Sequence, residues 1–319
     1  MKELLLIDAS SLVYRCFHAL PPLSASDGRP MNAIYGTASV LLRIFREERP
    51  EYAAACLDRP EPTFRKERYA DYKIQRPETP EDLASQLREV PQLFREFGIQ
   101  TFETPGLEAD DLIAALAVRF RKEKGLKIVI LTGDLDTLQL VSDGDLVVRT
   151  FRKGITDTFT YDETAVRERY GLRPDQLLDY KALIGDPSDN IKGVPGVGPK
   201  TACAVLQNFG TLERFWREGQ KKDPKLAGKL APFRKQIEMS RFLAELKTDA
   251  ETGVGSLEEL KANPPLASLA MYLGELGFAS LVKRLLAKDE PAGKDLPARS
   301  RKPHRRDEDR PPSAQGSIF

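Results

Sequence analysis

The chain has 319 residues, of which 41% are hydrophobic and 30% are charged, and its formal net charge is +1. This length and composition predict a soluble protein of about two domains. No apolar run reaches the ~20 residues of a membrane span and no signal-peptide pattern follows Met1, so we expect a cytoplasmic protein. Three scattered cysteines and two histidines are too few for a disulfide framework or a His-ligated metal centre. Any chemistry must therefore depend on carboxylates, lysine and arginine.

The first half of the chain predicts an α/β fold. Three short apolar runs, each followed by acid, are typical of strands buried on both faces of a parallel sheet: 3–8, 52–58 and 127–136. Helical patterns alternate with them at 32–48, 80–98 and 108–125. A further pair of strands is expected at 145–161, turning at Gly154.

The second half is predicted to be helical. Asp162 and Gly171 are typical of the cap and the end of one helix, and four more are expected at 200–208, 211–218, 226–247 and 265–287. Beyond Lys288 the composition shifts to Pro, Arg, Asp and Ser, which predicts a disordered tail. We therefore expect an α/β unit at 1–166, a helical unit at 167–288 and a tail at 289–319.

Acidic residues follow the predicted strands and recur later in the chain. They are Asp8, Asp58, Glu108, Asp110, Asp111, Asp134, Asp136, Asp186 and Asp189. Each alone could be a helix cap or a turn residue. Together they indicate hard divalent cations, because converging carboxylates repel one another and Mg²⁺ or Mn²⁺ prefer oxygen ligands. So many acids exceed the needs of one ion and favour a two-metal phosphodiester site.

Two other carboxylate enzymes or switches fit less well. A haloacid-dehalogenase-type site needs DxDxT after the first strand, whereas the sequence there is DASSL. A receiver domain would not need acids as late as 186 and 189.

The stretch GVPGVGPKTA (193–202) is typical of a helix-hairpin-helix turn. Its glycines let backbone N–H groups approach phosphate, and a helix start favours an anion. The residues involved are Gly193, Gly196, Gly198, Lys200 and Thr201. It is not a Walker A loop, and a purely structural turn is the alternative. Contacts of this kind hold duplex DNA without reading its sequence.

Together these stretches resemble the 5′-nuclease (flap endonuclease) family, in the form found at the N-terminus of bacterial DNA polymerase I and as separate bacterial exonucleases. The motifs are IDASSLVYR, LDRPEPTFRKERYADYKIQR, GLEADDLIA, TGDLDTLQLV and GDPSDNIKGVPGVGPKTA, within residues 2–285. The resemblance implies a PIN-like parallel-sheet nuclease domain with a helical arch at about 59–95, then a helix-hairpin-helix (H3TH) domain. No polymerase region follows, so we expect a stand-alone nuclease.

The resemblance also assigns roles to residues. The first metal cluster falls on Asp8, Asp58, Glu108 and Asp110, and the second on Asp134, Asp136, Asp186 and Asp189, with Asp111 nearby. Two Mg²⁺ or Mn²⁺ ions are implied, with a K⁺ at the hairpin. No acid of the set is substituted, which favours an active enzyme over a non-catalytic DNA-binding scaffold.

The basic stretch 64–76 could be a solvated face, but the resemblance makes it part of the arch. Lys73 and Arg76 match the basic pair that reaches the scissile phosphate, and Arg65 and Tyr72 are assigned with them to DNA contacts. Tyr14 matches a position on which a base stacks; a core tyrosine is the alternative.

The implied activity is that of a 5′→3′ exonuclease and 5′-flap endonuclease. It would act on DNA ends, flaps and RNA–DNA hybrids in lagging-strand processing and repair, as a monomer at the bacterial nucleoid. The final QGSIF resembles a sliding-clamp peptide through Gln315, Ile318 and Phe319, although Gly316 replaces the usual Leu and a chance match is the alternative. The closeness of Asp186 and Asp189 to the hairpin indicates a fixed distance between gripped DNA and the cut.

Overall fold

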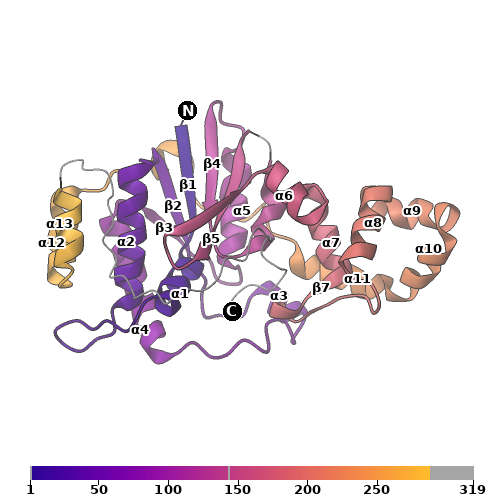
Figure 1. The fold of residues 1–319 in the computed structure, drawn as a ribbon, viewed down its shortest axis with the longest axis horizontal. Helices are drawn as coiled ribbons and strands as arrows, with labels where there is room; N and C mark the ends of the chain where they lie inside the picture. Colours follow the sequence, from indigo (N-terminus) through magenta and orange to yellow (C-terminus); the bar gives the residue numbers. More distant parts are fainter. Residues whose placement is uncertain (1, 143, 288–319) are drawn as a thin grey trace, which may run out of the picture.

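A six-stranded sheet forms the centre of the first half of the chain (Figure 1). The computed structural model describes residues 2–142 and 144–287. The strand order is β3-β2-β1-β4-β5-β6, and neighbours are parallel except β5 with β6. The bounds are Lys2–Asp8 (β1), Tyr52–Cys56 (β2), Gln100–Phe102 (β3), Leu126–Leu131 (β4), Leu146–Lys153 (β5) and Asp157–Tyr161 (β6). The predicted α/β fold is confirmed, as is the pair of strands turning at Gly154.

Each face of the sheet packs against helices, because successive side chains of a strand point to opposite faces. In β1, Leu5 and Ile7 join one core while Leu4 and Leu6 join the other. The first core is covered by α1 (Ala9–Ala19), α2 (Asn32–Glu47) and α4 (Glu81–Glu96), and the second by α5 (Ala109–Phe120). The apolar run at 3–8 thus serves two cores at once.

Residues 59–80 form the arch segment, which passes beneath the carboxyl ends of the strands. It contains the short helix α3 (Phe64–Arg68) and a run of turns, and Figure 1 shows it running along the lower edge toward α4. The predicted arch extended to residue 95, but α4 packs against α1 and α2 through buried Leu83, Val90 and Leu93. That helix therefore belongs to the layer over the sheet.

The helical region extends away from the sheet, at the right of Figure 1. It comprises α6 (Glu163–Tyr170), α7 (Leu177–Ile184), α8 (Pro199–Phe209), α9 (Leu212–Lys222), α10 (Pro224–Leu230) and α11 (Arg234–Ala244). Asp162 caps α6 by accepting from the Ala165 amide, and Gly171 ends it with φ 68°, as predicted. The single helix expected at 226–247 is divided by a 3₁₀ turn at Ala231–Phe233, because Pro232 has no N–H to continue a helix.

The last two described helices return to the sheet layer. They are α12 (Leu266–Glu275) and α13 (Ala279–Leu286), separated at Gly277 with φ 77°, where one helix was expected. Leu269 and Leu281 pack in the same core as Leu5. The predicted helical unit 167–288 therefore divides, with its end joining the first domain. The predicted tail contacts of Gln315, Ile318 and Phe319 lie outside the described residues.

Among residues 2–142 and 144–287, none of the helices is both long and apolar enough to cross a membrane.

A close backbone crossing lies within the helical region, between the end of α7 and the start of the hairpin. The short strands β7 (Gly185–Asp186) and β8 (Ile191–Lys192) pair antiparallel, and Gly193 follows them. A Cβ on Gly193 would lie 2.0 Å from the Ile184 carbonyl oxygen, so only glycine fits there.

We therefore expect Gly193→Ala to lower the free energy of unfolding by about 1–3 kcal/mol through overpacking. Gly228→Ala, at a position inside α10 where a Cβ would meet nothing within 4 Å, is the control. Urea denaturation of both variants measures the difference, and equal stability of the two would contradict the crossing.

Candidate active site

The acidic residues gather at the carboxyl edge of the sheet. Asp8 ends β1, Asp58 follows β2 and Asp134 follows β4, and these three strands are neighbours. The N-terminus of α5 brings Glu108 and Asp110 to the same edge. Parallel strands thus place at one edge residues that are far apart in sequence.

Two acids of the first cluster, Asp8 and Asp58, are held by neutral donors. Asp8 accepts from the Ser11 amide at 2.9 Å and from the Thr132 hydroxyl at 2.7 Å. Asp58 accepts from the Ala109 amide at 2.9 Å, which joins the end of β2 to the start of α5. Burial, and next the neighbouring Asp58, raise the pKa of Asp8 to about 7. The site therefore disfavours its own negative charge.

Asp110 gives the test of whether the site fits a metal. Its Oδ1 is buried and accepts no hydrogen bond from any residue of the described chain. Burial, followed by repulsion from Glu108, raises the pKa of Asp110 well above its ordinary value. A buried carboxylate oxygen without a donor, beside other acids, is the ligand that a hard divalent cation takes.

The second cluster comes from three short segments. Asp136, Asp186 and Asp189 each offer an oxygen, and these oxygens lie within 4.8 Å of one another. Asp136 lies in the 3₁₀ helix η1 (Leu135–Leu140), and its amide donates to Asp134 Oδ1 at 2.8 Å. The donor set is all oxygen, so both clusters fit divalent cations such as Mg²⁺.

Lys181 on α7 lies in the second cluster, where the sequence patterns did not indicate a lysine. Its Nζ contacts Asp136 Oδ1 and donates to Asp186 Oδ2 at 2.6 Å. Although burial alone would raise it, Lys181 lowers the pKa of Asp186 below its ordinary value. Its place five residues before Asp186 was the available signal, since a helix ending there brings the lysine back toward that acid.

Arg65 and Asp111 form a buried pair behind the first cluster. Arg65 is 1% exposed and donates to both Asp111 oxygens at 2.7 Å, to Glu108 at 3.0 Å and to the carbonyls of Leu243 and Glu245. All five guanidinium donors are used. Because the side chain is enclosed by protein, these contacts favour a structural role for Arg65 over the predicted contact with DNA.

Asp111 is close to the metal-ligand candidates but its acceptors are occupied. It groups with Glu108 and Asp110 by distance. However, its oxygens also accept from the amides of Glu108 and Lys247, in addition to Arg65. This saturation argues against the predicted role of Asp111 as a metal ligand and favours a positioning role.

The arch segment contributes Tyr72, Lys73 and Arg76. Tyr72 is 3% exposed and its hydroxyl donates to Glu108, which favours a structural role over the predicted contact with DNA. Lys73 Nζ donates to Glu108 Oε1 at 2.6 Å, and Arg76 donates to Asp189 Oδ1 at 2.6 Å. Of the two predicted catalytic cations, Lys73 thus contacts the first cluster and Arg76 the second, and Lys73 Nζ also lies 3.9 Å from Asp189 of the second cluster.

Contacts with the loop of the second cluster hold the arch segment in place. Lys73 has φ 53°, a conformation rare outside glycine, and its amide donates to the Asp189 carbonyl at 3.0 Å. Asn190 donates from its side chain to the Asp71 carbonyl at 2.8 Å, and Gln75 donates to the Pro187 carbonyl. The arch and the second cluster are therefore one unit in this structure.

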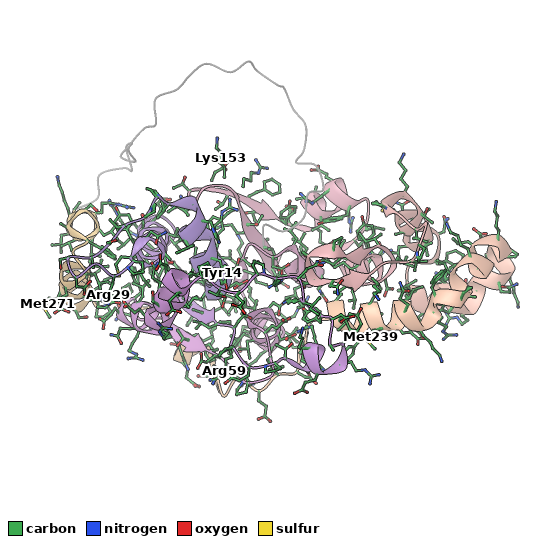
Figure 2. All side chains as sticks on the ribbon, turned by 90° about the horizontal axis from the view of Figure 1, so that it is seen from below. Tyr14, Arg29, Arg59, Lys153, Met239 and Met271 are labelled. Atoms are coloured by element: carbon green, nitrogen blue, oxygen red, sulfur yellow. The ribbon has the colours of Figure 1, made fainter. Side chains whose placement is uncertain are left out.

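Tyr14 and the hairpin residues are at least partly exposed to solvent, as their predicted contacts with DNA require. Tyr14 is half-buried on α1, with its hydroxyl at Thr79 of the arch segment, and Figure 2 labels it near the middle of the molecule. Gly198 is the N-cap of α8, and Gly196 and Lys200 are exposed beside it; Thr201 is partly exposed. Their contacts with DNA remain predictions.

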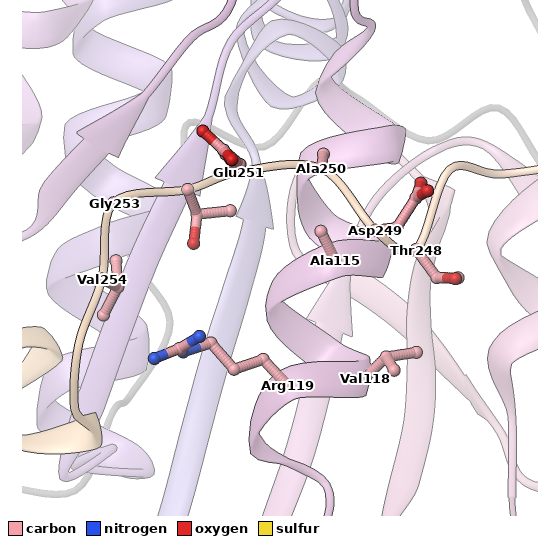
Figure 3. Close-up of a pocket in the computed structure, with 10 residues that line it drawn as sticks. Ala115, Val118, Arg119, Thr248, Asp249, Ala250, Glu251, Gly253 and Val254 are labelled. Carbon is pink, nitrogen blue, oxygen red and sulfur yellow. The ribbon is translucent and has the colours of Figure 1, made fainter.

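A shallow pocket of about 490 Å³ lies elsewhere, between the second half of α5 and residues 248–254 (Figure 3). Arg119 lines it and hydrogen-bonds the Gly255 carbonyl. It contains no residue of either acidic cluster.

Because removing one partner of a buried ion pair leaves a charge without compensation, Arg65→Met should lower the free energy of unfolding by about 3–5 kcal/mol. Arg88→Met, which removes the exposed Arg88–Glu81 pair, should change it by at most about 1 kcal/mol. Urea denaturation measures both. A similar small effect of the two substitutions would remove the structural role of Arg65.

A second prediction concerns pH in EDTA. The folded pKa of Asp8, about 7, lies above the ordinary 3.8, so folding favours the protonated form. Its stabilising contribution is present below pH 3.8 and is lost as the pH rises through about 7. Asp8→Asn should therefore lose less thermal stability over this interval than the wild type. Asp249→Asn, a substitution at an exposed aspartate, is the control and should behave like the wild type. If Asp8→Asn also behaves like the wild type, the pKa of Asp8 is not raised and the prediction is wrong.

Comparisons with known proteins match this geometry. Residues 3–171 match the family model for the 5′-3′ exonuclease, N-terminal resolvase-like domain, and residues 172–268 that for the 5′-3′ exonuclease, C-terminal SAM fold. The 5′-3′ exonuclease of Aquifex aeolicus is 40% identical over 289 residues, covering 89% of this chain and 96% of that protein. DNA polymerase I of Bacillus subtilis is 39% identical over 287 residues, 89% of this chain but 32% of the polymerase.

Solved structures share the fold at low sequence identity. The T5 D15 protein co-crystallised with metal ions has a TM-score of 0.62 and 18% identity, covering 89% of this chain and 97% of that one. The catalytic core of Rad2 in complex with DNA has a TM-score of 0.57 and 18% identity, covering 89% and 93%. The family assignment rests on the sequence matches: the chain belongs to the 5′-3′ exonuclease family, and it is a phosphodiester hydrolase.

Proposed function

We propose that the protein removes nucleotides from 5′ ends of DNA and cuts 5′ flaps, and that its chemistry uses two divalent metal ions. The observation that carries this proposal is the pair of acidic clusters at the carboxyl edge of the sheet, with Lys73 of the arch segment on the first cluster and Arg76 on the second. The T5 D15 flap endonuclease, which shares the fold, is described in a complex with DNA and metal ions. This supports the same substrate class here.

The first ion would be held by Asp8, Asp58, Glu108 and Asp110, and the second by Asp134, Asp136, Asp186 and Asp189. When bound, such a pair supplies positive charge to both the attacking and the leaving oxygens of a phosphodiester. Mg²⁺ and Mn²⁺ fit best, because every available ligand atom is a carboxylate oxygen.

Lys73 and Arg76 would orient the scissile phosphate and stabilise its developing charge. Both are only partly exposed, at 22% and 33%, and both already lie against carboxylates of the clusters. Substrate phosphate would take over these donors at the position where they are held. Tyr14 lies beside the arch segment, with its hydroxyl at Thr79, and a base of the DNA substrate could stack on its ring.

The hairpin at 193–201 would hold the duplex part of the substrate. Gly198 and Lys200 at the start of α8 offer backbone amides and a cation to one phosphate. The K⁺ ion implied at this hairpin, the sliding clamp as partner of the tail, and action on RNA primers during lagging-strand synthesis and repair remain parts of the proposal. A non-catalytic scaffold would need the hairpin but not the acids.

Cleavage of a 5′-flapped duplex with Mg²⁺ tests the proposal. The wild type should cut at the base of the flap, and Asp134→Asn/Asp136→Asn should abolish cutting while DNA binding persists. Lys73→Met should lower the single-turnover rate by roughly 10²–10³, the usual effect of removing a group that stabilises the transition state. Lys235→Met, an exposed lysine of α11, serves as the control.

Well-folded wild type that binds the flap without cutting it would favour the scaffold. Cutting that survives in the double variant would overturn the assignment of the second cluster.

A further inference from the structure

The second acidic cluster contains a lysine of its own. Lys181 Nζ lies between Asp136 and Asp186, which come from two separate segments, η1 and β7. Its side chain is 21% exposed, so its charge is partly shielded from water. An ammonium placed between two carboxylates occupies the kind of position that a bound cation would take.

The two clusters differ in how their negative charges are balanced. In the second, Lys181 pairs with Asp136 and Asp186, while Arg76 pairs with Asp189. In the first, Glu108 accepts from Lys73 and Arg65, whereas Asp8 and Asp58 accept from a hydroxyl and backbone amides and Asp110 Oδ1 accepts from no described residue. Cations therefore contact three of the four acids of the second cluster but only one of the four acids of the first.

Lys181 also differs from the other cations in where it is anchored. Arg76 belongs to the arch segment, whose backbone and side chains are joined to the second cluster by hydrogen bonds with residues 187–190. Lys181 lies on α7, whose Leu177, Ala182 and Leu183 are buried in the core that continues from the sheet. A backbone fixed in this way keeps its lysine at the cluster whatever the arch segment does.

We propose that Lys181 is a specificity-determining residue of the second cluster: it is the resident counter-ion that holds Asp136 and Asp186 together and weakens their affinity for a divalent ion. This inference rests on the proposed two-ion site and adds an order to it. The first cluster fills at low metal concentration. The second fills only when the ion competes with the ammonium, so the second ion binds more weakly than the first.

The test counts metal ions without measuring cleavage. Mn²⁺ binding to the DNA-free full chain is followed by isothermal titration calorimetry, with free Mn²⁺ checked by electron paramagnetic resonance. Lys181→Met keeps the length of the side chain but removes the charge. It should tighten the weaker binding step roughly tenfold or more, because a unit charge a few ångströms from the ion is lost. The tighter step should stay within a factor of about two.

Two controls separate charge from side-chain shape. Lys181→Arg keeps a cation at the cluster and should retain the weak second step. Lys235→Met makes the same substitution at an exposed lysine of α11 and should bind Mn²⁺ as the wild type does. An unchanged second step in Lys181→Met, or an equal change of both steps, would overturn the proposal.

Thermal unfolding gives a second readout. If Lys181 holds the carboxylates together, Lys181→Met should melt at a lower temperature in EDTA, and saturating Mn²⁺ should restore the wild-type value. A lysine that merely packs on α7 would lower the melting temperature equally with and without Mn²⁺, which would contradict the proposal. Should Lys181→Met not fold in EDTA, Lys181→Gln purified with Mn²⁺ provides the same comparison.

Failure of this inference and failure of the proposed function give different results. If the wild type binds two Mn²⁺ ions in unequal steps but does not cut a 5′ flap, the proposed function is wrong. The role of Lys181 is then still tested by comparing Mn²⁺ binding of Lys181→Met with that of the wild type. If the wild type and Lys181→Met both bind a single ion, the role of Lys181 is overturned. If only the variant binds two, the role is supported.

Discussion

Mutual repulsion among carboxylates is the constraint on which this structure depends. The carboxyl edge of the sheet gathers acids from β1, β2, β4, α5 and the loop after α7, and burial raises the pKa of several of them. Four basic side chains lie among these acids: Arg65, Lys73, Arg76 and Lys181. Each comes from a segment outside the sheet. Ion pairs between these four cations and the acids therefore join α7 and the arch segment to the carboxyl edge of the sheet.

Contacts of these basic residues also join segments that are far apart in the sequence. Arg65 connects α3 to α5 and to the end of α11, and Asp189 receives both the side chain of Arg76 and the amide of Lys73. Directly after this loop, the chain crosses its own backbone at Gly193 and enters the hairpin. This short, tightly packed link fixes the spacing between the acids and the hairpin.

Much of the fold was predictable because its signals are local. Apolar runs ending in acid located three neighbouring parallel strands, while the three residues of β3 are too few to show a period. Exposure is not a local property, so Arg65 and Tyr72 were assigned to DNA although they are buried. Lys181 was missed because a lone lysine in an apolar helix usually reaches solvent; Asp186 is near it in sequence, but only tertiary structure brings Asp136 to the same ammonium.

Because α12 and α13 return to the sheet layer, the first hydrophobic core extends beyond the last residue that the family models match. The second family match ends at residue 268, within α12, yet Leu273, Phe278 and Leu281 beyond it are buried with Leu5 and Ile34 in the first core. A protein shortened to the matched region would leave the outer surfaces of α2 and α4 without their apolar cover. Solubility, rather than catalysis, is the property that such a truncation would compromise first.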